Sequence, residues 1–407
     1  MSAHGSERDT LATALALALG AAVSLGLARF SYAVLLPPMR SDLAWSYFTA
    51  GAMNTSNAAG YLAGALFAPA LLRRSGARAS FVGGSLCVAL LLAAHGVTRS
   101  DALLYTLRFA TGVASAAVFV AGGLLAARLG TRLASGSRVT PGLVLGLYYG
   151  GTGLGIVASA LLLPPLVALP ASASGPAGWQ WSWIALAALA LAATLPIARR
   201  TASLREAVDT SSARASFDWR PLGFGLAAYF MFGLGYIGYM TFIVSLLREQ
   251  RMSTGAVVAF YALLGCGVMA SPWLWAGLLQ RERGGRGLAL LCALLAVATA
   301  LPVLFDQALP AFVSGALFGA VFLSVVASTT ALVRHNLPPA AWPAGIAAFT
   351  IVFAVGQIVG PSVVGKLADG AGGLRAGFVA SAAALALGAA LAWRQRALQP
   401  ATTWRGR

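Results

Sequence analysis

Residues 11–36 read LATALALALGAAVSLGLARFSYAVLL and contain one charged residue, Arg29. A hydrocarbon layer about 30 Å thick is crossed by roughly 20 apolar residues in an α-helix, so this run is long enough to span a membrane. Its apolar part, 11–27, is longer than the hydrophobic region of a secretory signal, roughly 7–15 residues, and the preceding Glu7-Arg8-Asp9 is a poor signal start. The sequence therefore predicts a retained first transmembrane helix.

Similar apolar runs recur along the whole chain of 407 residues, of which 59% are hydrophobic and 10% are charged. A soluble protein of this length would need more polar surface than such a composition supplies. We therefore predict an all-α membrane protein with twelve transmembrane helices. The predicted helices are 11–36, 47–72, 79–97, 102–129, 141–169, 179–197, 221–247, 255–279, 287–305, 311–333, 342–366 and 374–393.

The polar segment 199–220 divides the predicted helices into two sets of six. The expected domains are an N-terminal segment at 1–10, a six-helix bundle at 11–198, a linker at 199–220, a second six-helix bundle at 221–394 and a tail at 395–407. An offset of 207 residues also brings four pairs of glycines into register: Gly26 with Gly233, Gly60 with Gly267, Gly112 with Gly319, and Gly153 with Gly360. Duplicated halves are common among secondary transporters, so we expect two pseudo-symmetric bundles.

The basic residues indicate which loops face the cytoplasm, because cytoplasmic loops carry an excess of Lys and Arg. With the N-terminus placed inside, the inner segments hold twenty of the 28 Lys and Arg residues and the outer loops hold six. The other two, Arg29 and Arg108, lie within predicted helices. We therefore expect a multi-pass protein of a bacterial inner membrane, with both termini and the linker in the cytoplasm.

The net charge of +17 does not indicate a nucleic-acid-binding protein. The arginines lie at the ends of apolar runs, and no basic stripe alternates with exposed aromatic residues as a nucleic-acid groove would require. Cys87, Cys266 and Cys292 are an odd number of cysteines within apolar runs, which favours packing residues over disulfides or metal ligands. The sequence predicts no metal, no cofactor and no nucleic-acid partner.

Enzymatic and sensory functions fit the sequence less well than transport does. The chain contains no G-x-x-x-x-G-K-[ST] motif, which excludes a P-loop ATPase. It has three histidines and lacks the clustered His, Asp, Glu or Ser residues from which a membrane enzyme would be built. The longest polar segment has some twenty residues, which is short for the output domain of a sensor.

Glycines spaced four residues apart recur in the predicted helices, and this spacing lets helix backbones approach closely. The pairs are Gly60 and Gly64, Gly146 and Gly150, Gly151 and Gly155, Gly315 and Gly319, and Gly356 and Gly360. The densest group lies on the fifth helix and comprises Gly146, Gly150, Gly151, Gly153 and Gly155. It indicates a surface on which this helix bends or slides.

Several motifs resemble those of the major facilitator superfamily, and the resemblance covers nearly the whole chain. Leu104-Tyr-Thr-Leu-Arg108-Phe-Ala-Thr-Gly112 is similar to the fourth-helix motif of that superfamily, an arginine four residues before a glycine. The fifth-helix glycines and Gly356-Gln-Ile-Val-Gly360-Pro361 resemble its glycine-rich helix motif. The turn Arg73-Arg74-Ser75-Gly76-Ala77-Arg78 resembles its basic cytoplasmic turn, although Arg73 stands where an aspartate is usual.

A narrower resemblance is to the bacterial YbfB/YjiJ branch. It rests on Gly26-Leu-Ala-Arg29-Phe30-Ser-Tyr32-Ala-Val-Leu-Leu-Pro37, on Trp45-Ser-Tyr47, and on Asn54, Asn57 and Gly60-Tyr61. The resemblance implies the major facilitator fold, in which the first and fourth helices line a central cavity, and a role in transport. It does not imply a particular substrate.

Arg29 and Arg108 are the only ionisable residues well inside the predicted helices, and none of the 11 acidic residues lies there. A charge in the bilayer costs at least about 2.5–3.5 kcal/mol on insertion scales, so each arginine requires a reason. Tyr32 shares a helix face with Arg29, and Asn54 and Asn57 form a polar stripe on the second helix. Because a guanidinium binds a carboxylate through two N–H groups, these five residues predict a substrate-binding pocket for an anion.

Other roles are open for the two arginines. Both could donate to backbone carbonyls or water and stiffen the first half of the protein. Arg108, which lies in the fourth-helix motif, could serve proton coupling or a conformational switch instead of contacting the substrate.

The second half supplies a more aromatic surface. Tyr236 stands at the position that the offset pairs with Arg29, and Gln357 lies near mid-depth on the eleventh helix. We include both in the predicted substrate site, because an aromatic wall opposite a cationic one suits an amphipathic organic anion. Tyr229 and Phe232 are expected to be ordinary packing residues.

The expected function is a secondary active transporter or facilitator that moves a small organic solute, an anion in particular, by alternating access. A proton-coupled efflux pump for hydrophobic compounds is the alternative within the transporters, and a non-transporting membrane sensor is the alternative from another class. A coupling proton has no evident site, since the predicted helices bury no acid and His95 and His335 lie near helix ends, where we expect interfacial positions. We expect the protein to act as a monomer in the lipid bilayer.

Overall fold

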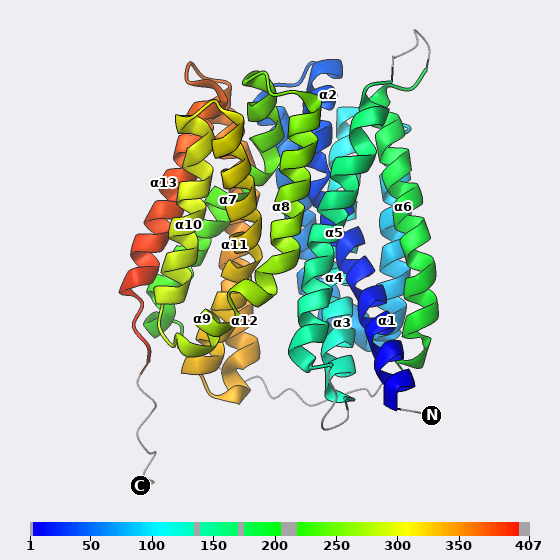
Figure 1. Ribbon diagram of the computed structural model, residues 1–407, viewed down its shortest axis with the longest axis vertical. Coiled ribbons are helices and arrows are strands. Elements are labelled where there is room, and N and C mark those ends of the chain that lie inside the picture. The colour runs from blue at the N-terminus through cyan, green and yellow to red at the C-terminus, as the bar shows by residue number, and fades with distance from the viewer. Residues whose placement is uncertain (1–2, 134–138, 170–174, 205–217, 399–407) are drawn as a thin grey trace.

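The computed structural model describes residues 3–133, 139–169, 175–204 and 218–398, and every regular element in these ranges is helical (Figure 1). The long elements are α1 (Ala3–Ala21), η1 (Ala22–Phe30), α2 (Tyr32–Asp42), α3 (Tyr47–His95), α4 (Asp101–Thr131), α5 (Pro141–Val167), α6 (Gly178–Arg200), α7 (Gly223–Glu249), α8 (Thr254–Leu274), α9 (Ala276–Arg281), α10 (Arg286–Leu304), α11 (Ala308–Asn336), α12 (Trp342–Ala368) and α13 (Gly373–Arg394). Short 3-10 helices η2 (Thr201–Ser203), η3 (Arg220–Leu222) and η4 (Pro339–Ala341) lie between them. Eleven helical stretches in these ranges are long and apolar enough to cross a membrane.

Hydroxyl side chains start three of the long helices. Ser46 accepts a hydrogen bond from the backbone of α3 at 3.0 Å, Thr140 from that of α5 at 3.2 Å, and Ser253 from that of α8 at 3.3 Å. Each satisfies one of the backbone N–H groups that the first turn of a helix leaves without a partner. Pro141 follows Thr140 at the first helical position, where a proline costs no hydrogen bond.

The 49 residues of α3 form two membrane crossings. At roughly 1.5 Å per residue, this length exceeds twice a hydrocarbon core of about 30 Å. Gly76 interrupts the helix with φ 78° and ψ 163°, a conformation that favours glycine. The basic turn Arg73-Arg74 and Arg78 surrounds it, and Arg78 donates to the carbonyl of Ala198 at 3.0 Å, near the end of α6. With α3 counted as two crossings, the described part of the chain contains the predicted twelve.

The first crossing contains a π-helix that the sequence did not predict. Its nine residues, Ala22–Phe30, are all buried, and the element ends where the N–H of Ser31 bonds to the carbonyl of Gly26 at 3.0 Å. π-Helical turns are rare and often occur at functional sites. This one carries Arg29 in its last turn, so the local geometry changes at the residue on which the predicted site depends.

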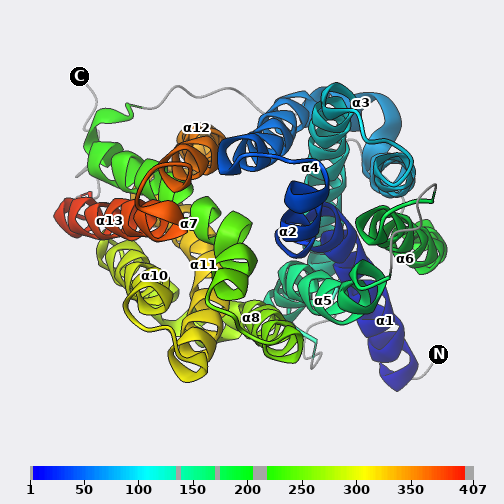
Figure 2. The same ribbon diagram turned by 90° about the horizontal axis from the view of Figure 1, so that it is seen from above.

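The helices pack as two groups, seen most clearly along the bundle axis (Figure 2). In the first, α3 packs on α4 and α6, and α1 packs on α5 and α6; in the second, α7 packs on α12 and α13, and α10 packs on α11 and α13. The groups meet through α5 with α8, α3 with α12, and α2 with α7. The first and last described residues lie at one end of the bundle, which we call the terminal end; the other is the distal end (Figure 1).

Glycine contacts repeat between the halves with the offset of 207 that the sequence suggested. A Cβ added at Gly60 would lie 2.0 Å from the carbonyl oxygen of Phe109, and one at Gly267 would lie 2.9 Å from that of Ala316. A Cβ at Gly112 would lie 2.1 Å from the carbonyl oxygen of Asn57, and one at Gly319 the same distance from that of Leu264. Glycine and partner shift together in both cases, so the same helix pair is packed in the same register in each half.

The expected helix limits hold within a few residues, with two exceptions. The first predicted helix, 11–36, is longer in the structure, where α1, η1 and α2 together extend from Ala3 to Asp42. The predicted helix 255–279 is divided into α8 and α9, with Trp275 between them. Pro272, which lacks a backbone N–H, lies three residues before this break. The expected linker begins inside α6, which extends to Arg200, and residues 205–217 of it lie outside the described ranges.

Candidate functional site

Arg29 lies where the two halves of the protein meet. Its side chain is 4% exposed, and its Nη2 donates to Oε1 of Gln357, on α12, at 2.8 Å. The same oxygen accepts from the hydroxyl of Tyr236, on α7, at 3.0 Å. Three residues that the sequence singled out separately are thus joined through one amide oxygen, across 328 positions of the chain.

The guanidinium of Arg29 has few protein partners for a buried charge. Within the described residues it forms no ion pair with a carboxylate, and its Nε is buried without a hydrogen-bond partner. The rings of Tyr61 and Phe30 lie 5.5 and 5.9 Å from its Cζ, which gives partial cation–π compensation. Most of its five N–H donors are therefore left for another partner.

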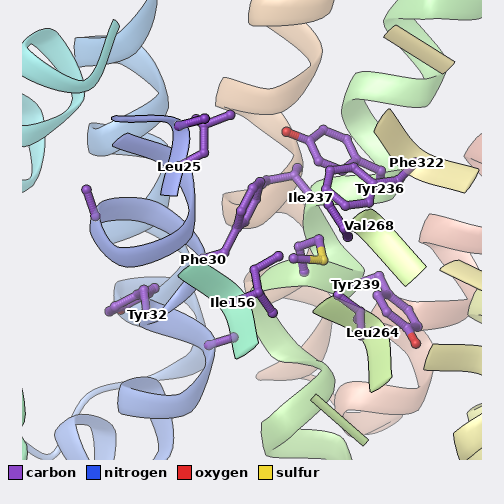
Figure 3. Packing of buried hydrophobic residues seen from close by; sticks show 14 of the residues in the cluster. Leu25, Phe30, Tyr32, Ile156, Tyr236, Ile237, Tyr239, Leu264, Val268 and Phe322 are labelled. Atoms are coloured by element: carbon purple, nitrogen blue, oxygen red, sulfur yellow. The ribbon is translucent and has the colours of Figure 1, made fainter. Parts of the chain in front are cut away.

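Aromatic side chains cover the second half of the interface. Tyr236 stacks on Phe232 at 4.8 Å and on Phe353 at 5.5 Å between ring centroids. Phe30, next to Arg29, meets Phe322 edge-on at 5.7 Å, and the close-up shows Phe30 directed from the first half toward Tyr236 and Phe322 (Figure 3). The amide and guanidinium of the site therefore lie beside a continuous aromatic surface.

Arg108 has a different environment from Arg29, although it is equally buried. Its Nη1 donates to the carbonyl of Ala28 at 2.9 Å, in the π-helix, and its Nη2 donates to Oδ1 of Asn54 at 3.2 Å. Nδ2 of Asn54 in turn donates to the hydroxyl of Thr241, on α7, at 2.6 Å. Arg108 thus ends a hydrogen-bonded chain that crosses from the first half to the second.

The remaining predicted site residues of the first half bond to protein. The hydroxyl of Tyr32 donates to the carbonyl of Ala50 at 2.9 Å, and its ring lies 4.7 Å from Cζ of Arg108. Nδ2 of Asn57 donates to the carbonyl of Arg108 at 3.0 Å. Tyr32 and Asn57 therefore hold Arg108 in place, and their contacts favour a supporting role over direct contact with cargo.

The sequence did not identify Thr241 as a polar partner, and the position that it predicted for His95 is wrong. The hydroxyl of Thr241 also donates to its own helix, at the carbonyl of Ile237, 2.6 Å away, as isolated hydroxyls in apolar helices commonly do. His95 was expected at an interface, but it is fully buried. It stacks on Trp183 at 4.6 Å, and its Nδ1 lies 2.7 Å from the carbonyl of Leu91, so packing between two helices overrides its position near a helix end.

Two of the fifth-helix glycines pack inside the first half. A Cβ at Gly151 would lie 2.0 Å from the carbonyl oxygen of Ala18, and one at Gly155 would lie 2.5 Å from that of Ala22. Both contacts are to backbone, which cannot move aside as a flexible side chain can. These two positions hold α5 against the first crossing.

Three other glycines of α5 face α8 of the second half. A Cβ at Gly153 would lie 2.3 Å from the carbonyl oxygen of Gly265. One at Gly146 would lie 3.3 Å from the ring of Trp273, and one at Gly150 would lie 3.4 Å from the carbonyl oxygen of Met269. Glycines at turn spacing thus form the α5 side of a contact between the halves.

Because Gly151 packs inside the first half and Gly153 packs against the second half, we expect alanine at these two positions to have different effects. Gly151→Ala should lower the melting temperature, because overpacking inside one half costs about 1–3 kcal/mol in every conformation. Gly153→Ala should displace α5 from α8 and favour conformations in which the halves separate. Thiol labelling of Val157→Cys, with the two exposed cysteines Cys87 and Cys266 replaced by serine, would measure this, because Val157 packs against Gly265 of α8: its labelling rate should rise in Gly153→Ala and not in Gly151→Ala. Equal labelling in both variants would contradict the assignment of Gly153 to a moving surface.

The glycine-rich part of α12, like α5, contacts helices of both halves. Cβ atoms at Gly356 and Gly360 would lie 2.4 and 2.5 Å from the carbonyl oxygens of Phe230 and Leu234, both on α7. Pro361 faces the other half, where its carbonyl oxygen would lie 2.2 Å from a Cβ at Gly51 of α3. The motif thus brings α12 close to a neighbour in each half.

The distal end is closed by contacts between α3 and the second half. The carboxylate of Asp369 accepts from the backbone N–H groups of Tyr47 and Phe48 at 2.7 and 2.9 Å. A carboxylate at a helix N-terminus also interacts favourably with the helix dipole. The hydroxyl of Tyr47 donates to Glu249 of α7, and the side chains of Thr55 and Ser362 are hydrogen-bonded at 2.9 Å.

Comparison with known proteins places this arrangement in one family. The family model described as "Uncharacterised MFS-type transporter YbfB" matches residues 21–393. Two solved structures share the fold at low sequence identity: an inward-facing, unoccupied bacterial homologue of the human lysosomal transporter Spinster (TM-score 0.72, 16% identity, 95% of this chain and 96% of that chain), and the nucleoside transporter NupG (TM-score 0.66, 15% identity, 94% and 100%). Comparison with curated protein sequences found no match. The chain belongs to the YbfB family of MFS-type transporters, and it is a multi-pass membrane transporter rather than an enzyme.

Proposed function

We propose that this transporter carries a small organic anion, with a carboxylate in particular, by alternating access through the interface that contains Arg29. The observation that carries the proposal is the guanidinium of Arg29: it is buried between the halves, has one hydrogen bond to protein, and has no carboxylate partner in the described part of the chain. An uncompensated charge in such a place is a functional candidate by default. An anionic cargo would supply the missing counterion.

The cargo chemistry follows from the groups around Arg29. A planar guanidinium with unused N–H donors can bind a carboxylate through two parallel hydrogen bonds. The stacked rings of Tyr236 and Phe353 offer an apolar surface beside it, which suits the organic body of the cargo. An organic anion uses both surfaces, whereas an inorganic anion would leave the aromatic one unused.

Cargo binding is coupled to the contact between the halves through Gln357. Its amide oxygen accepts from Arg29 and from Tyr236, so it competes with any anion for the same guanidinium. A carboxylate that takes the hydrogen bond from Arg29 releases one link between η1 and α12. The chain from Arg108 through Asn54 to Thr241 is a second link, which must break when the halves separate on that side.

The direction of exposure follows from the charge distribution. In the topology predicted from the sequence, the segments on the side of the termini hold twenty of the 28 basic residues. Because cytoplasmic loops carry the excess of basic residues, we place the terminal end in the cytoplasm and the protein in the bacterial inner membrane. The distal contacts of Asp369 with Tyr47 and Phe48 then close the outer face.

A matched ligand screen tests the proposed cargo class. Aromatic carboxylates such as benzoate, phenylacetate and indole-3-acetate are compared with their primary amides, which keep shape and polarity but carry no charge. A ligand that binds the folded state raises the melting temperature of the purified protein. At least one acid should do so while its amide does not, and this acid should enter proteoliposomes that contain the protein faster than it enters protein-free liposomes. Equal stabilisation by acids and amides would instead indicate the alternative, an efflux pump for hydrophobic compounds.

A cross-link across the distal contact tests alternating access. Thr55→Cys and Ser362→Cys together should form a disulfide under a mild oxidant, because the two hydroxyl oxygens lie 2.9 Å apart and a disulfide joins sulfurs at about 2.05 Å. The oxidised protein should lose uptake of the acid found by the screen, and a reductant should restore it. Each variant that carries only one of the two substitutions, treated in the same way, is the control. Undiminished uptake in the cross-linked protein would show that the distal contact need not open.

A further inference from the structure

A second charged cavity lies away from the central site, at the terminal end of the second half. Its volume is about 1120 Å³, and it lies between the start of α7, the segment that joins α9 to α10, and the chain that follows α13. We call it the arginine pocket. It is lined by Arg281, Arg283, Arg286, Arg394 and Arg396, together with Glu282, Phe224 and Trp393.

The arginine pocket has a surplus of positive charge that the described protein does not neutralise. Five arginines and one acidic residue, Glu282, line the cavity. None of the five is part of an ion pair in the portion of the chain that the structure describes. Arg286 lies over the ring of Trp393, with 5.6 Å between Cζ and the ring centroid. Five positive charges around one cavity favour a bound anion.

Hydrogen bonds between different segments hold the walls of the pocket in place. The side chain of Gln395, 4% exposed, accepts from the backbone of Gly225 at 2.9 Å and donates to the carbonyl of Pro221 at 3.0 Å. The N–H of Gly285 donates to the carbonyl of Gln395 at 2.9 Å. Asn336 of α11 donates to the carbonyl of Arg283 at 2.8 Å and accepts from the N–H of Leu398 at 2.6 Å. The arginines are therefore presented by a fixed scaffold of four segments.

The rim of the pocket indicates that its anion comes from the membrane. Trp393 ends the spanning helix α13 and is 66% exposed, and Phe224 lies in the first turn of α7 and is 46% exposed. Exposed tryptophans at helix ends are typical of the level of the lipid headgroups. Basic pockets at this level recognise phosphate-bearing headgroups. We infer that the arginine pocket binds the headgroup of an anionic phospholipid.

Calorimetric titration of the full-length protein in a neutral detergent tests this inference. The probes are dioctanoyl phosphatidylglycerol, dioctanoyl phosphatidylcholine and inorganic phosphate. The first should bind and the other two should not. Arg283→Gln with Arg396→Gln should weaken phosphatidylglycerol binding roughly 30-fold, about fivefold for each arginine removed. The matched control is Arg73→Gln with Arg74→Gln, two exposed arginines in the turn of the first half, which should bind as the wild type does.

Each other outcome overturns the inference. Equal binding of inorganic phosphate by the wild type would assign the pocket to a soluble phosphate. If both double variants bound phosphatidylglycerol equally more weakly than the wild type, the lipid would be attracted by the general surface charge and not by a specific site. Unchanged binding in Arg283→Gln with Arg396→Gln would exclude the pocket. Should that variant fail to fold, Arg281→Gln with Arg394→Gln tests the same cavity, with the same expected loss. None of these residues touches the central site, so the result is independent of the proposed cargo.

Discussion

Replacing Arg29 with methionine is expected to make the protein without cargo more stable. The substitution removes a buried charge that costs about 2.5–3.5 kcal/mol on insertion scales and is only partly compensated by nearby rings. It leaves no unsatisfied partner, because Oε1 of Gln357 still accepts from Tyr236. A net gain of about 1–3 kcal/mol corresponds to a rise of several degrees in melting temperature. Thermal unfolding of Arg29→Met and wild type in the same detergent measures it.

The control for this prediction is Arg29→Lys, which keeps the charge and loses the planar fork. It should melt near or below the wild type, because a compact ammonium is more strongly hydrated than a guanidinium and is costlier to bury. A lower melting temperature for Arg29→Met would show that Arg29 serves the fold. The reason for assigning it to cargo would then be lost.

Arg108→Met is expected to have the opposite effect, a fall of several degrees. Both terminal nitrogens of Arg108 bond to protein, so its removal leaves the carbonyl of Ala28 and Oδ1 of Asn54 without these donors. Each buried acceptor left unsatisfied costs about 1–3 kcal/mol, and two of them outweigh the relief of one hydrogen-bonded charge. Thermal unfolding of the purified variant, beside Arg29→Met, measures the difference.

Arg108→Lys serves as the matched control, since an ammonium cannot reproduce the two-pronged contact to Ala28 and Asn54. It too should be less stable than the wild type. If Arg108→Met were instead stabilised as much as Arg29→Met, the two arginines would be equivalent. The distinction between a cargo-binding arginine and a structural one would then be wrong.

Most of the fold could be predicted because the length of an apolar run and the residues at its ends are local features that indicate a membrane-spanning helix. Helix limits such as 141–169 against Pro141–Val167 follow from the length of the apolar run and the capping Thr140. The π-helix at Ala22–Phe30 could not be predicted, because its carbonyl at Ala28 is fixed by Arg108 from a helix 80 positions away. The break at Trp275 could not be predicted from Pro272, because a proline also lies inside a helix that continues, as Pro361 does in α12.

Residues of the site could be predicted from the sequence where a polar side chain lies in an otherwise apolar helix. Arg29, Arg108 and Gln357 are polar residues in apolar helices, so each was identified without knowledge of the others. Their partners were not identifiable, since Arg29 and Gln357 are separated by 328 positions and meet through the packing of the two halves. Thr241 gave no signal, because a lone hydroxyl in a helix can be satisfied by its own backbone, and it does bond there to Ile237.

The central claim is that the buried guanidinium of Arg29 pairs with an anionic cargo. The direct test is the dissociation constant of the carboxylate found by the screen, measured calorimetrically on the wild type, on Arg29→Gln and on Arg29→Lys. Hydrogen bonds to charged groups contribute about 1.5–3 kcal/mol, so Arg29→Gln should bind roughly 10–150-fold more weakly while its weak affinity for the matched amide is unchanged. Arg29→Lys should fall between the two. Equal affinity of the carboxylate for Arg29→Gln and for the wild type would contradict the claim.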